Sequence, residues 1–322
     1  MRRRARLQQN VMLSLTEDQV RRLADVDVVI EALRTAFARD FSQTLEMPVR
    51  SSVSLPDQGV LLLMPAYDSF LGLAGIKKVT VTVAAGVNAS YELLDPCSGM
   101  TLARMEANWL TDLRTAATSA VVTSVLARSD TRTLGIFGTG RQAEAHIAVL
   151  KHVRNFTRIR VCGSGSSDVQ QFCRTMSDRY KMQVDPADAE SCVRQSDVVC
   201  TCTTSHAPVL RGSWLKPGMH LNLIGAFQPE SREVDSETIQ RSRVVVDTYA
   251  GAWAEAGDLL IPLREGVIQK SGVMADLHEM LNEKKRVRTG ADDITLFKSV
   301  GCALEDLVIA KLVYDRAKSI AA

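Results

Sequence analysis

Arg114 is a residue whose type and position could bind an anion. It lies in the segment LTDLRTAATSA, residues 110–120, directly before a row of small residues. Such a row indicates a helix that packs closely against another element. A guanidinium there can hold a carboxylate through two parallel hydrogen bonds, because its planar group is always charged. Most arginines are solvated surface residues, however, so the segment allows both an anion-binding role and an ordinary surface role.

A glycine-rich turn follows a short apolar segment in TLGIFGTGRQAEAHIAVL, residues 133–150. Gly138 permits a tight turn, Gly140 lets the backbone approach a pyrophosphate, and Ala143 lets helix and strand pack closely. The first amides of the following helix can then bind phosphate. The pattern is weak alone, but here it follows a predicted strand and opens a predicted helix. We therefore predict a dinucleotide-binding site.

The end of the second strand, in IRVCGSGSSDV (residues 159–169), bears on which dinucleotide binds. NAD-binding proteins usually place an acidic residue there to bind the ribose 2′-hydroxyl. In this chain Gly163 and Ser164 take that place, and Asp168 comes several residues later. Glycine and serine leave room for a 2′-phosphate, which Arg141 could approach from the first loop. We therefore expect NADP(H) to be favoured over NAD(H).

The elements that must position these residues change in character along the chain. After residue 129, strands and helices alternate, which indicates a parallel sheet with crossover helices. The strands are predicted at 133–137, 158–162, 197–202, 220–224 and 244–247.

The flanking segments have a different pattern. Residues 14–40 are predicted to be helical, and strands are predicted within 49–83, including two around the turn Asp57-Gln58-Gly59. A further strand leads to Thr111, which we expect to cap the helix of Arg114. Residues 294–317 are predicted to be mostly helical. The expected fold is α/β, with a Rossmann-type parallel sheet domain plus a mixed α+β domain.

Composition excludes several classes of protein. The 322 residues carry a net charge of +2 and are 46% hydrophobic, so we expect no nucleic-acid partner and no membrane segment. The basic segment Met1–Arg6 is interpreted as a disordered tail, with nucleic-acid binding as the alternative. Seven scattered cysteines and five histidines show no metal-ligand spacing. They indicate reduced thiols, a cytoplasmic location and no metal.

The chain resembles the ornithine cyclodeaminase/μ-crystallin family over nearly its whole length. The resemblance implies a Rossmann domain, residues 120–299, inserted in a dimerisation and substrate-binding domain, residues 1–119 and 300–322. It also implies a homodimer. The matching motifs are MPVR (47–50), GIKKVTV (75–81), LTDLRTAATSA (110–120), GTGRQAEAH (138–146), CTTSHAPVL (202–210), GAFQPESREVD (225–235), AGDLLIPLREGVI (256–268) and ITLFKSVGCALEDL (294–307).

Three cations match the positions where the family binds the carboxylate of a small α-amino or α-imino acid. They are Arg50, Lys77 and Arg114, of which Lys77 and Arg114 are the predicted catalytic residues. Strand alternation sends only one of Lys77 and Lys78 inward, and Lys77 is the match. Arg50 has the alternative of an ordinary arginine at a strand start.

The predicted cofactor contacts come from the glycine-rich turn and from later strand ends. The segment KSVG at 298–301 has the alternative of a plain helix N-terminus. The predicted residues are Thr115, Gly138, Thr139, Gly140, Arg141, Gln142, Gly163, Ser164, Thr203, Thr204, Ser205, Gly225, Lys298, Val300 and Gly301.

One departure from the family pattern bears on the reaction. Cyclodeaminases place an aspartate after the glycine of the GAFQPESREVD region, whereas this chain has Ala226 and Phe227. Glu233 and Asp235 come later, where we expect helix capping or a surface role. The resemblance then implies a ketimine reductase that reduces Δ1-pyrroline-2-carboxylate or Δ1-piperideine-2-carboxylate to L-proline or L-pipecolate. The alternatives are an alanine-dehydrogenase-like or opine-type oxidoreductase, an ornithine cyclodeaminase, and a non-catalytic NADPH-dependent binder of small molecules.

Overall fold

Buried and less buried residues alternate along the middle of strand β5, Leu73–Thr82, so that the strand buries one face. The computed structural model describes residues 12–321, and the basic segment Met1–Arg6 lies outside them. In this part of the chain β5 lies within a mixed sheet with the strand order β1-β7-β6-β5-β4-β2, and β3 pairs with β4. The other strands are β1 (Leu13–Leu15), β2 (Leu45–Glu46), β3 (Ser51–Ser54), β4 (Val60–Asp68), β6 (Gly86–Leu94) and β7 (Thr101–Glu106).

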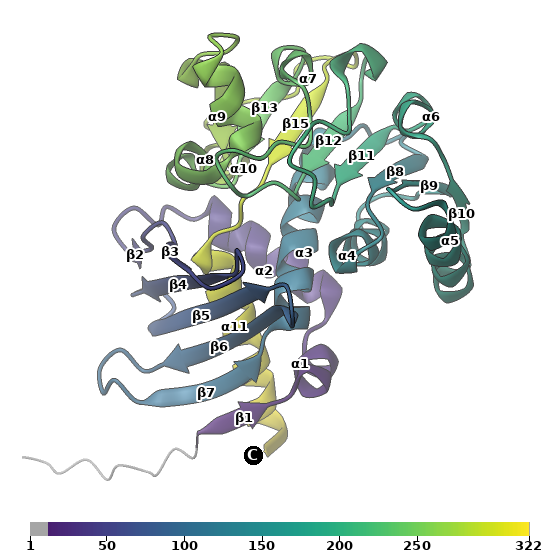
Figure 1. Cartoon of the computed structure of the whole chain (residues 1–322). Helices are drawn as coiled ribbons and strands as arrows, with labels where there is room; N and C mark the ends of the chain where they lie inside the picture. Colours follow the sequence, from purple (N-terminus) through teal and green to yellow (C-terminus); the bar gives the residue numbers. More distant parts are fainter. Residues whose placement is uncertain (1–11, 322) are drawn as a thin grey trace, which may run out of the picture. The chain divides into compact units, whose positions relative to one another are not determined.

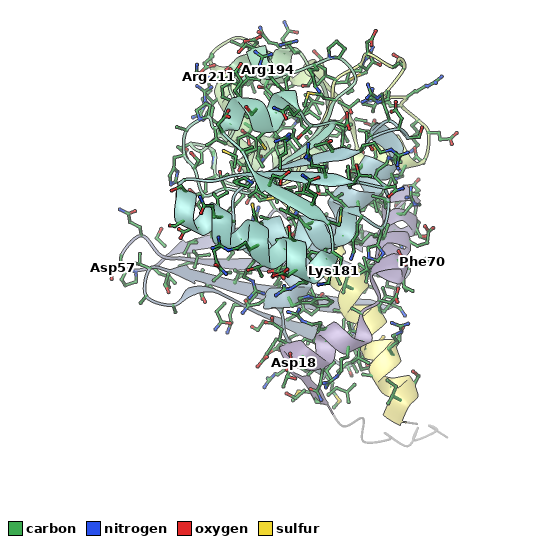
Figure 2. The ribbon with its side chains drawn as sticks, turned by 90° about the vertical axis from the view of Figure 1, so that its right-hand side faces the viewer. Asp18, Asp57, Phe70, Lys181, Arg194 and Arg211 are labelled. Atoms are coloured by element: carbon green, nitrogen blue, oxygen red, sulfur yellow. The ribbon has the colours of Figure 1, made fainter. Side chains whose placement is uncertain are left out.

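The turn between β3 and β4 confirms the two strands predicted around it. Asp57 and Gln58 both have positive φ angles, of 54° and 60°, and Figure 2 labels Asp57 at the tip of this turn. Two helices pack on the sheet: α11 (Ala303–Ala321) against β4, β5 and β6, and α1 (Glu17–Leu23) against β7.

A second sheet contains only parallel strands, in the order β10-β9-β8-β11-β12-β15-β13-β14. Figure 1 shows it with helices along its strands, as in a Rossmann-type fold. The predicted strands are confirmed to within a residue or two, and β10, β14 and β15 were not predicted. The strands are β8 (Thr133–Phe137), β9 (Arg158–Cys162), β10 (Gln183–Pro186), β11 (Val198–Thr201), β12 (His220–Leu223), β13 (Arg243–Val246), β14 (Val273–Asp276) and β15 (Thr295–Lys298).

Nine helices accompany the parallel sheet in the described residues. They are α2 (Val26–Ala38), α3 (Asn108–Leu126), α4 (Arg141–Leu150), α5 (Ser166–Tyr180), α6 (Ala189–Arg194), α7 (Ser236–Gln240), α8 (Tyr249–Glu255), α9 (Gly257–Arg264) and α10 (Leu277–Leu281). Within residues 12–321, no helix is both long enough and apolar enough to cross a membrane.

The chain forms two compact units. The mixed unit contains the described residues up to Asp25, then Phe41–Thr111, and the residues from Ala303 onward. The parallel unit contains Val26–Asp40 and Asp112–Cys302. These boundaries lie eight and three residues from the expected 119/120 and 299/300, and α2 joins the parallel unit. It is held there by a hydrogen bond from Arg34 to Ser124 (2.7 Å) and one from His278 to the carbonyl of Phe37 (3.1 Å).

Three local predictions need correction. Residues 14–40 are largely helical as predicted, in α1 and α2 with Thr16 capping the first, but their start belongs to strand β1. Helix α3 begins at Asn108, so Thr111 lies inside its first turn and its hydroxyl donates to the carbonyl of Ala107 (2.8 Å) instead of capping. Residues 295–298 are a fully buried strand, β15, which the prediction of a mostly helical segment missed.

Candidate functional site

The turn after β8 has the backbone that the glycine pattern predicts. Gly138 has φ +106°, and a Cβ there would lie 2.5 Å from the carbonyl oxygen of Cys202. Gly140 is the N-cap of α4, and a Cβ there would have no atom within 4 Å. Ala143 is completely buried one turn further on. Because Gly140 faces open space beside uncapped helix amides, these residues fit the pyrophosphate of a dinucleotide.

The neighbouring loop after β9 lies beside this turn. The methyl group of Thr139 is 3.4 Å from the Cβ position of Gly163, and Gly163 and Ser164 are exposed. Asp168 folds back over the same loop, with Oδ2 3.0 Å from the Cβ position of Gly165. The structure thus brings together Thr139 and Gly163, two of the predicted cofactor contacts.

Arg141 and Gln142, at the start of α4, are both bound to Asp112 of α3. The guanidinium of Arg141 lies 2.6 Å from Asp112 Oδ2, and the amide of Gln142 donates to Oδ1 over 3.0 Å. Arg141 therefore has a carboxylate partner that it would have to leave, or share, in order to reach a 2′-phosphate.

Glu233 is a completely buried carboxylate at the ends of β11 and β12. Its two oxygens accept five hydrogen bonds, from the hydroxyls of Thr201 and Thr203 (2.7 and 2.8 Å) and from three backbone amides. Those amides belong to Thr203 (2.8 Å), Gly225 (2.7 Å) and Ala226 (3.3 Å). Burial raises the pKa of Glu233 and the neighbouring Lys298 opposes this shift. The expectation of a surface or capping role for Glu233 is therefore wrong.

Lys298 is also completely buried, and its ammonium group points into the parallel unit. It lies 3.0 Å from Asp258 Oδ2 and donates to the carbonyls of Leu223 (3.3 Å) and Ala226 (2.5 Å). Asp258 in turn accepts the amides of Glu233 (2.7 Å) and Val234 (3.2 Å) through Oδ1. The side chain of Lys298 thus binds protein groups behind the strand ends.

Arg114 is 6% exposed, which excludes the surface interpretation. Its guanidinium lies against Gly301, where φ is +80° and a Cβ would overlap Nη1 of Arg114. The turn that holds Gly301 is fixed by Asp247, which accepts the amides of Val300 (2.7 Å) and Gly301 (2.6 Å). Thr115, the next residue of α3, is buried as well. The parallel unit therefore places Arg114 beside the turn of Val300 and Gly301, and Thr115 follows Arg114 on α3.

Lys77 in the mixed unit is the inward-facing one of the two lysines, as the family match predicts. It is 1% exposed whereas Lys78 is exposed, and its Nζ lies 2.9 Å from Oδ1 of the buried Asp306 on α11. Tyr91 is the cross-strand partner of Lys77, and burial together with the charge of Asp306 raises the pKa of Tyr91. Arg50 is half-buried directly before β3.

The family model for the ornithine cyclodeaminase/mu-crystallin family matches residues 9–321.

The chain belongs to this family.

Two kinds of relative are similar over nearly the whole chain. The Delta(1)-pyrroline-2-carboxylate reductase of Bacillus cereus is 31% identical over 315 residues, which cover 95% of this chain and 97% of that protein. The structure of the Thermococcus litoralis Delta(1)-pyrroline-2-carboxylate reductase, in complex with NADH and L-proline, is 34% identical. Its TM-score is 0.93, and the match covers 97% of this chain and 99% of that one. An archaeal alanine dehydrogenase dimer with bound NAD is 30% identical with a TM-score of 0.90, covering 97% of both chains.

An apolar pair, Ala226 and Phe227, follows Gly225. Ala226 is 3% exposed, and Phe227 packs against the hydrophobic core of the parallel unit. Asp235, the later acid, caps α7 by accepting the amide of Thr238 (2.9 Å), as predicted. Thr204 is exposed, and the hydroxyl of Ser205 donates to the carbonyl of Ala207 (2.7 Å). Within the described residues, no group of three or more His, Cys, Asp or Glu side chains could hold a metal ion.

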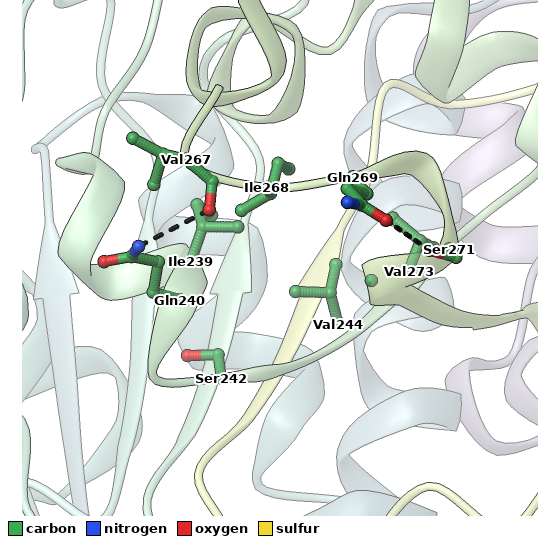
Figure 3. A pocket seen from close by; sticks show the side chains of 10 residues that line it. Ile239, Gln240, Ser242, Val244, Val267, Ile268, Gln269, Ser271 and Val273 are labelled. Atoms are coloured by element: carbon green, nitrogen blue, oxygen red, sulfur yellow. Dashed lines mark hydrogen bonds between the residues drawn. The ribbon is translucent and has the colours of Figure 1, made fainter. Parts of the chain in front are cut away.

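A separate hollow of about 330 Å³ lies beside Val244 of β13 and Val273 of β14, near the amino ends of these two strands. Figure 3 shows its two hydrogen bonds, from Gln240 to the carbonyl of Val267 (3.4 Å) and from Ser271 to Gln269 (3.5 Å). Since dinucleotides bind at the carboxyl ends of parallel strands, this hollow is not part of the candidate site.

Proposed function

We propose that this protein catalyses the NAD(P)H-dependent reduction of a cyclic imino acid, Δ1-pyrroline-2-carboxylate or Δ1-piperideine-2-carboxylate, to L-proline or L-pipecolate. The observation that carries the proposal is the apolar pair Ala226–Phe227, at the position where the cyclodeaminase pattern has an aspartate. Glu233 does not replace that acid, because both of its oxygens are bound to Thr201, Thr203 and the strand-end amides. Relatives named as pyrroline-2-carboxylate reductases give independent support.

The roles of the cations follow from their chemistry. Arg114 would bind the carboxylate of the imino acid, and Gly301 with Asp247 would fix the direction of its guanidinium. Such orientation supplies a large part of a rate enhancement. Arg50 and Lys77 are further candidates for carboxylate binding, and Lys77 carries protons that it can donate. The glycine turn at 138–140 would hold the cofactor, which when bound in its reduced form supplies the hydride.

We propose NADP(H) as the favoured cofactor, since Gly163 and Ser164 put no carboxylate directly at the end of β9. Two observations argue against a large preference for NADP(H) over NAD(H). Arg141 is already paired with Asp112, and the two similar structures contain NADH and NAD. We also propose a homodimer, as in the archaeal alanine dehydrogenase, and a cytoplasmic location. Light scattering of the purified protein tests the dimer, and kcat/KM ratios for NADPH and NADH test the preference.

The decisive experiment follows cofactor oxidation with Δ1-pyrroline-2-carboxylate, beside pyruvate plus ammonia and beside ornithine plus NAD. Rapid oxidation with the imine alone is the expected result. Ammonia release from ornithine would overturn it, and faster turnover of pyruvate would favour the alanine-dehydrogenase-like alternative. Arg114→Lys keeps the charge but loses the fork, so kcat/KM for the imine should fall about a hundredfold while cofactor affinity is retained.

A further inference from the structure

Glu233 is an ionisable group for which imine reduction has no chemical use, and it lies immediately behind the candidate cofactor site. It accepts hydrogen bonds from the residues that end β11 and from those that follow β12. These two strands are neighbours in the parallel sheet, and their carboxyl ends are where a dinucleotide binds in this fold. Thr203 and Gly225, which Glu233 holds, are themselves predicted cofactor contacts.

A third strand end joins the same group of buried charges. Lys298 closes β15, the other neighbour of β12, and its ammonium binds the carbonyls of Leu223 and Ala226. Asp258 binds Lys298 and also accepts the backbone amide of Glu233 itself. Glu233, Lys298 and Asp258 thus connect the ends of β11, β12 and β15.

We propose that Glu233 is a positioning residue for the dinucleotide. Its carboxylate holds the loops after β11 and β12 in the geometry that binds the cofactor, and Lys298 and Asp258 hold the carboxylate's own surroundings in place. This inference rests on the proposed function only in assuming that a nicotinamide dinucleotide binds at these strand ends.

The hydrogen bonding requires a carboxylate. Five donors converge on two oxygens that both accept and never donate, which an ionised Glu provides and a Gln does not. A Gln side chain would turn its NH₂ group toward N–H or O–H donors of at least one loop. The packing also leaves no room for a side chain at position 225, because a Cβ there would overlap both the carbonyl of Thr203 and the carboxylate of Glu233.

A neutral residue can replace Glu233 without leaving Lys298 unpaired, because Lys298 is also paired with Asp258. Glu233, Asp258 and Lys298 are all completely buried, and two carboxylates beside one ammonium leave one carboxylate in excess. In Glu233→Gln the Lys298–Asp258 pair remains and is neutral. We therefore expect this variant to fold, with one of the two loops released.

The test measures the affinity of the full-length protein for NADPH and for NADH by calorimetry, without any imine. Glu233→Gln should weaken the Kd of both dinucleotides about tenfold or more, the loss expected for charge-assisted hydrogen bonds. The matched control Glu190→Gln removes an exposed carboxylate of the same unit and should leave Kd unchanged. With saturating cofactor, the KM for the imine should be the same in Glu233→Gln as in the original protein.

An unchanged Kd in a Glu233→Gln variant with a lowered melting temperature would overturn the proposal and leave a purely structural carboxylate. Thr201→Val provides a second test that keeps the charge and removes one donor to Glu233. It should weaken Kd about threefold to tenfold, and an unchanged value would also overturn the proposal. If Glu233→Gln weakens Kd while the original protein reduces no imine, the inference stands and the proposed function fails.

Discussion

Each unit contains one buried lysine paired with a buried aspartate, and the surroundings of the two pairs differ. Lys77–Asp306 joins β5 to α11 in the mixed unit over 2.9 Å, and Lys298–Asp258 joins β15 to α9 in the parallel unit over 3.0 Å. Lys298 and Asp258 also bind four backbone groups, whereas Lys77 stands across the strand pair from Tyr91. The same chemical pair therefore fixes main-chain positions in one unit and joins a strand to a helix through side chains in the other.

The largest loss of stability should come from breaking the Lys298–Asp258 pair of the parallel unit. Lys298→Met removes the cation that is paired with Asp258 and that also lowers the pKa of the neighbouring Glu233. Breaking one buried pair costs about 3–5 kcal/mol, and the loss here should exceed about 5 kcal/mol. Folded yield and urea unfolding measure it. The double variant Lys298→Met/Asp258→Asn should recover part of the loss, and an unfolding free energy close to the original in the single variant would contradict the comparison.

Breaking the Lys77–Asp306 pair of the mixed unit should lower the unfolding free energy by a smaller amount. It should also abolish imine reduction. Lys77→Met removes the cation that lies 2.9 Å from the buried Asp306 and should lower the unfolding free energy by about 3–5 kcal/mol. Adding Asp306→Asn should restore stability but not imine reduction, if Lys77 binds the substrate. Lys78→Met is the matched control, because this neighbouring lysine is exposed and its loss should change stability by less than about 0.5 kcal/mol.

Any loss of stability that histidine protonation causes at acid pH should arise in the parallel unit, because this unit contains all five histidines of the chain. His146 is completely buried, and its Nδ1 donates to the carbonyl of Gln142 while Nε2 accepts from Ser119. Burial lowers the pKa of His146 to about 4, so its contribution is complete above pH 6.5 and is lost as the pH falls toward 4.

That loss amounts to about 3 kcal/mol of unfolding free energy between pH 6.5 and pH 4. His146→Gln should flatten the acid side of the stability profile, measured by urea unfolding at several pH values. An equally steep profile in the variant would show that other groups cause the acid loss.

The smallest effect should come from an exposed pair in the mixed unit. Arg104 and Glu92 face each other across β7 and β6 at 3.1 Å, with side chains 58% and 40% exposed. Arg104→Ala should cost less than about 1 kcal/mol, and high salt should remove even this difference. A larger loss, measured by thermal unfolding, would mean that burial is not what separates this pair from the two buried ones.

Much of the parallel unit could be predicted because its signals are local. The strand before Gly138, the turn itself and the small residue at 143 lie within a dozen positions. Glu233 could not be recognised in this way. Its donors come from residues 201–203 and 225–226, so its burial is a property of the assembled sheet and not of its own segment.

Strand β15 was missed for a related reason. Its four residues, Thr295–Lys298, are all buried and come shortly before the long helix α11. A short buried strand has no alternation, so periodicity does not separate it from an apolar helix. Its place between β12 and β13 is set by pairing with strands that lie some fifty to seventy-five residues earlier in the chain.

The position of β15 has a consequence for how the protein is made. It is the last strand of the parallel sheet in chain order, yet it lies between β12 and β13, which do not pair with each other. During synthesis from the N-terminus, β12 and β13 must wait with open edges until residues 295–298 leave the ribosome. Such edges invite pairing with other chains, so slow translation just before this strand should favour aggregation and dependence on chaperones.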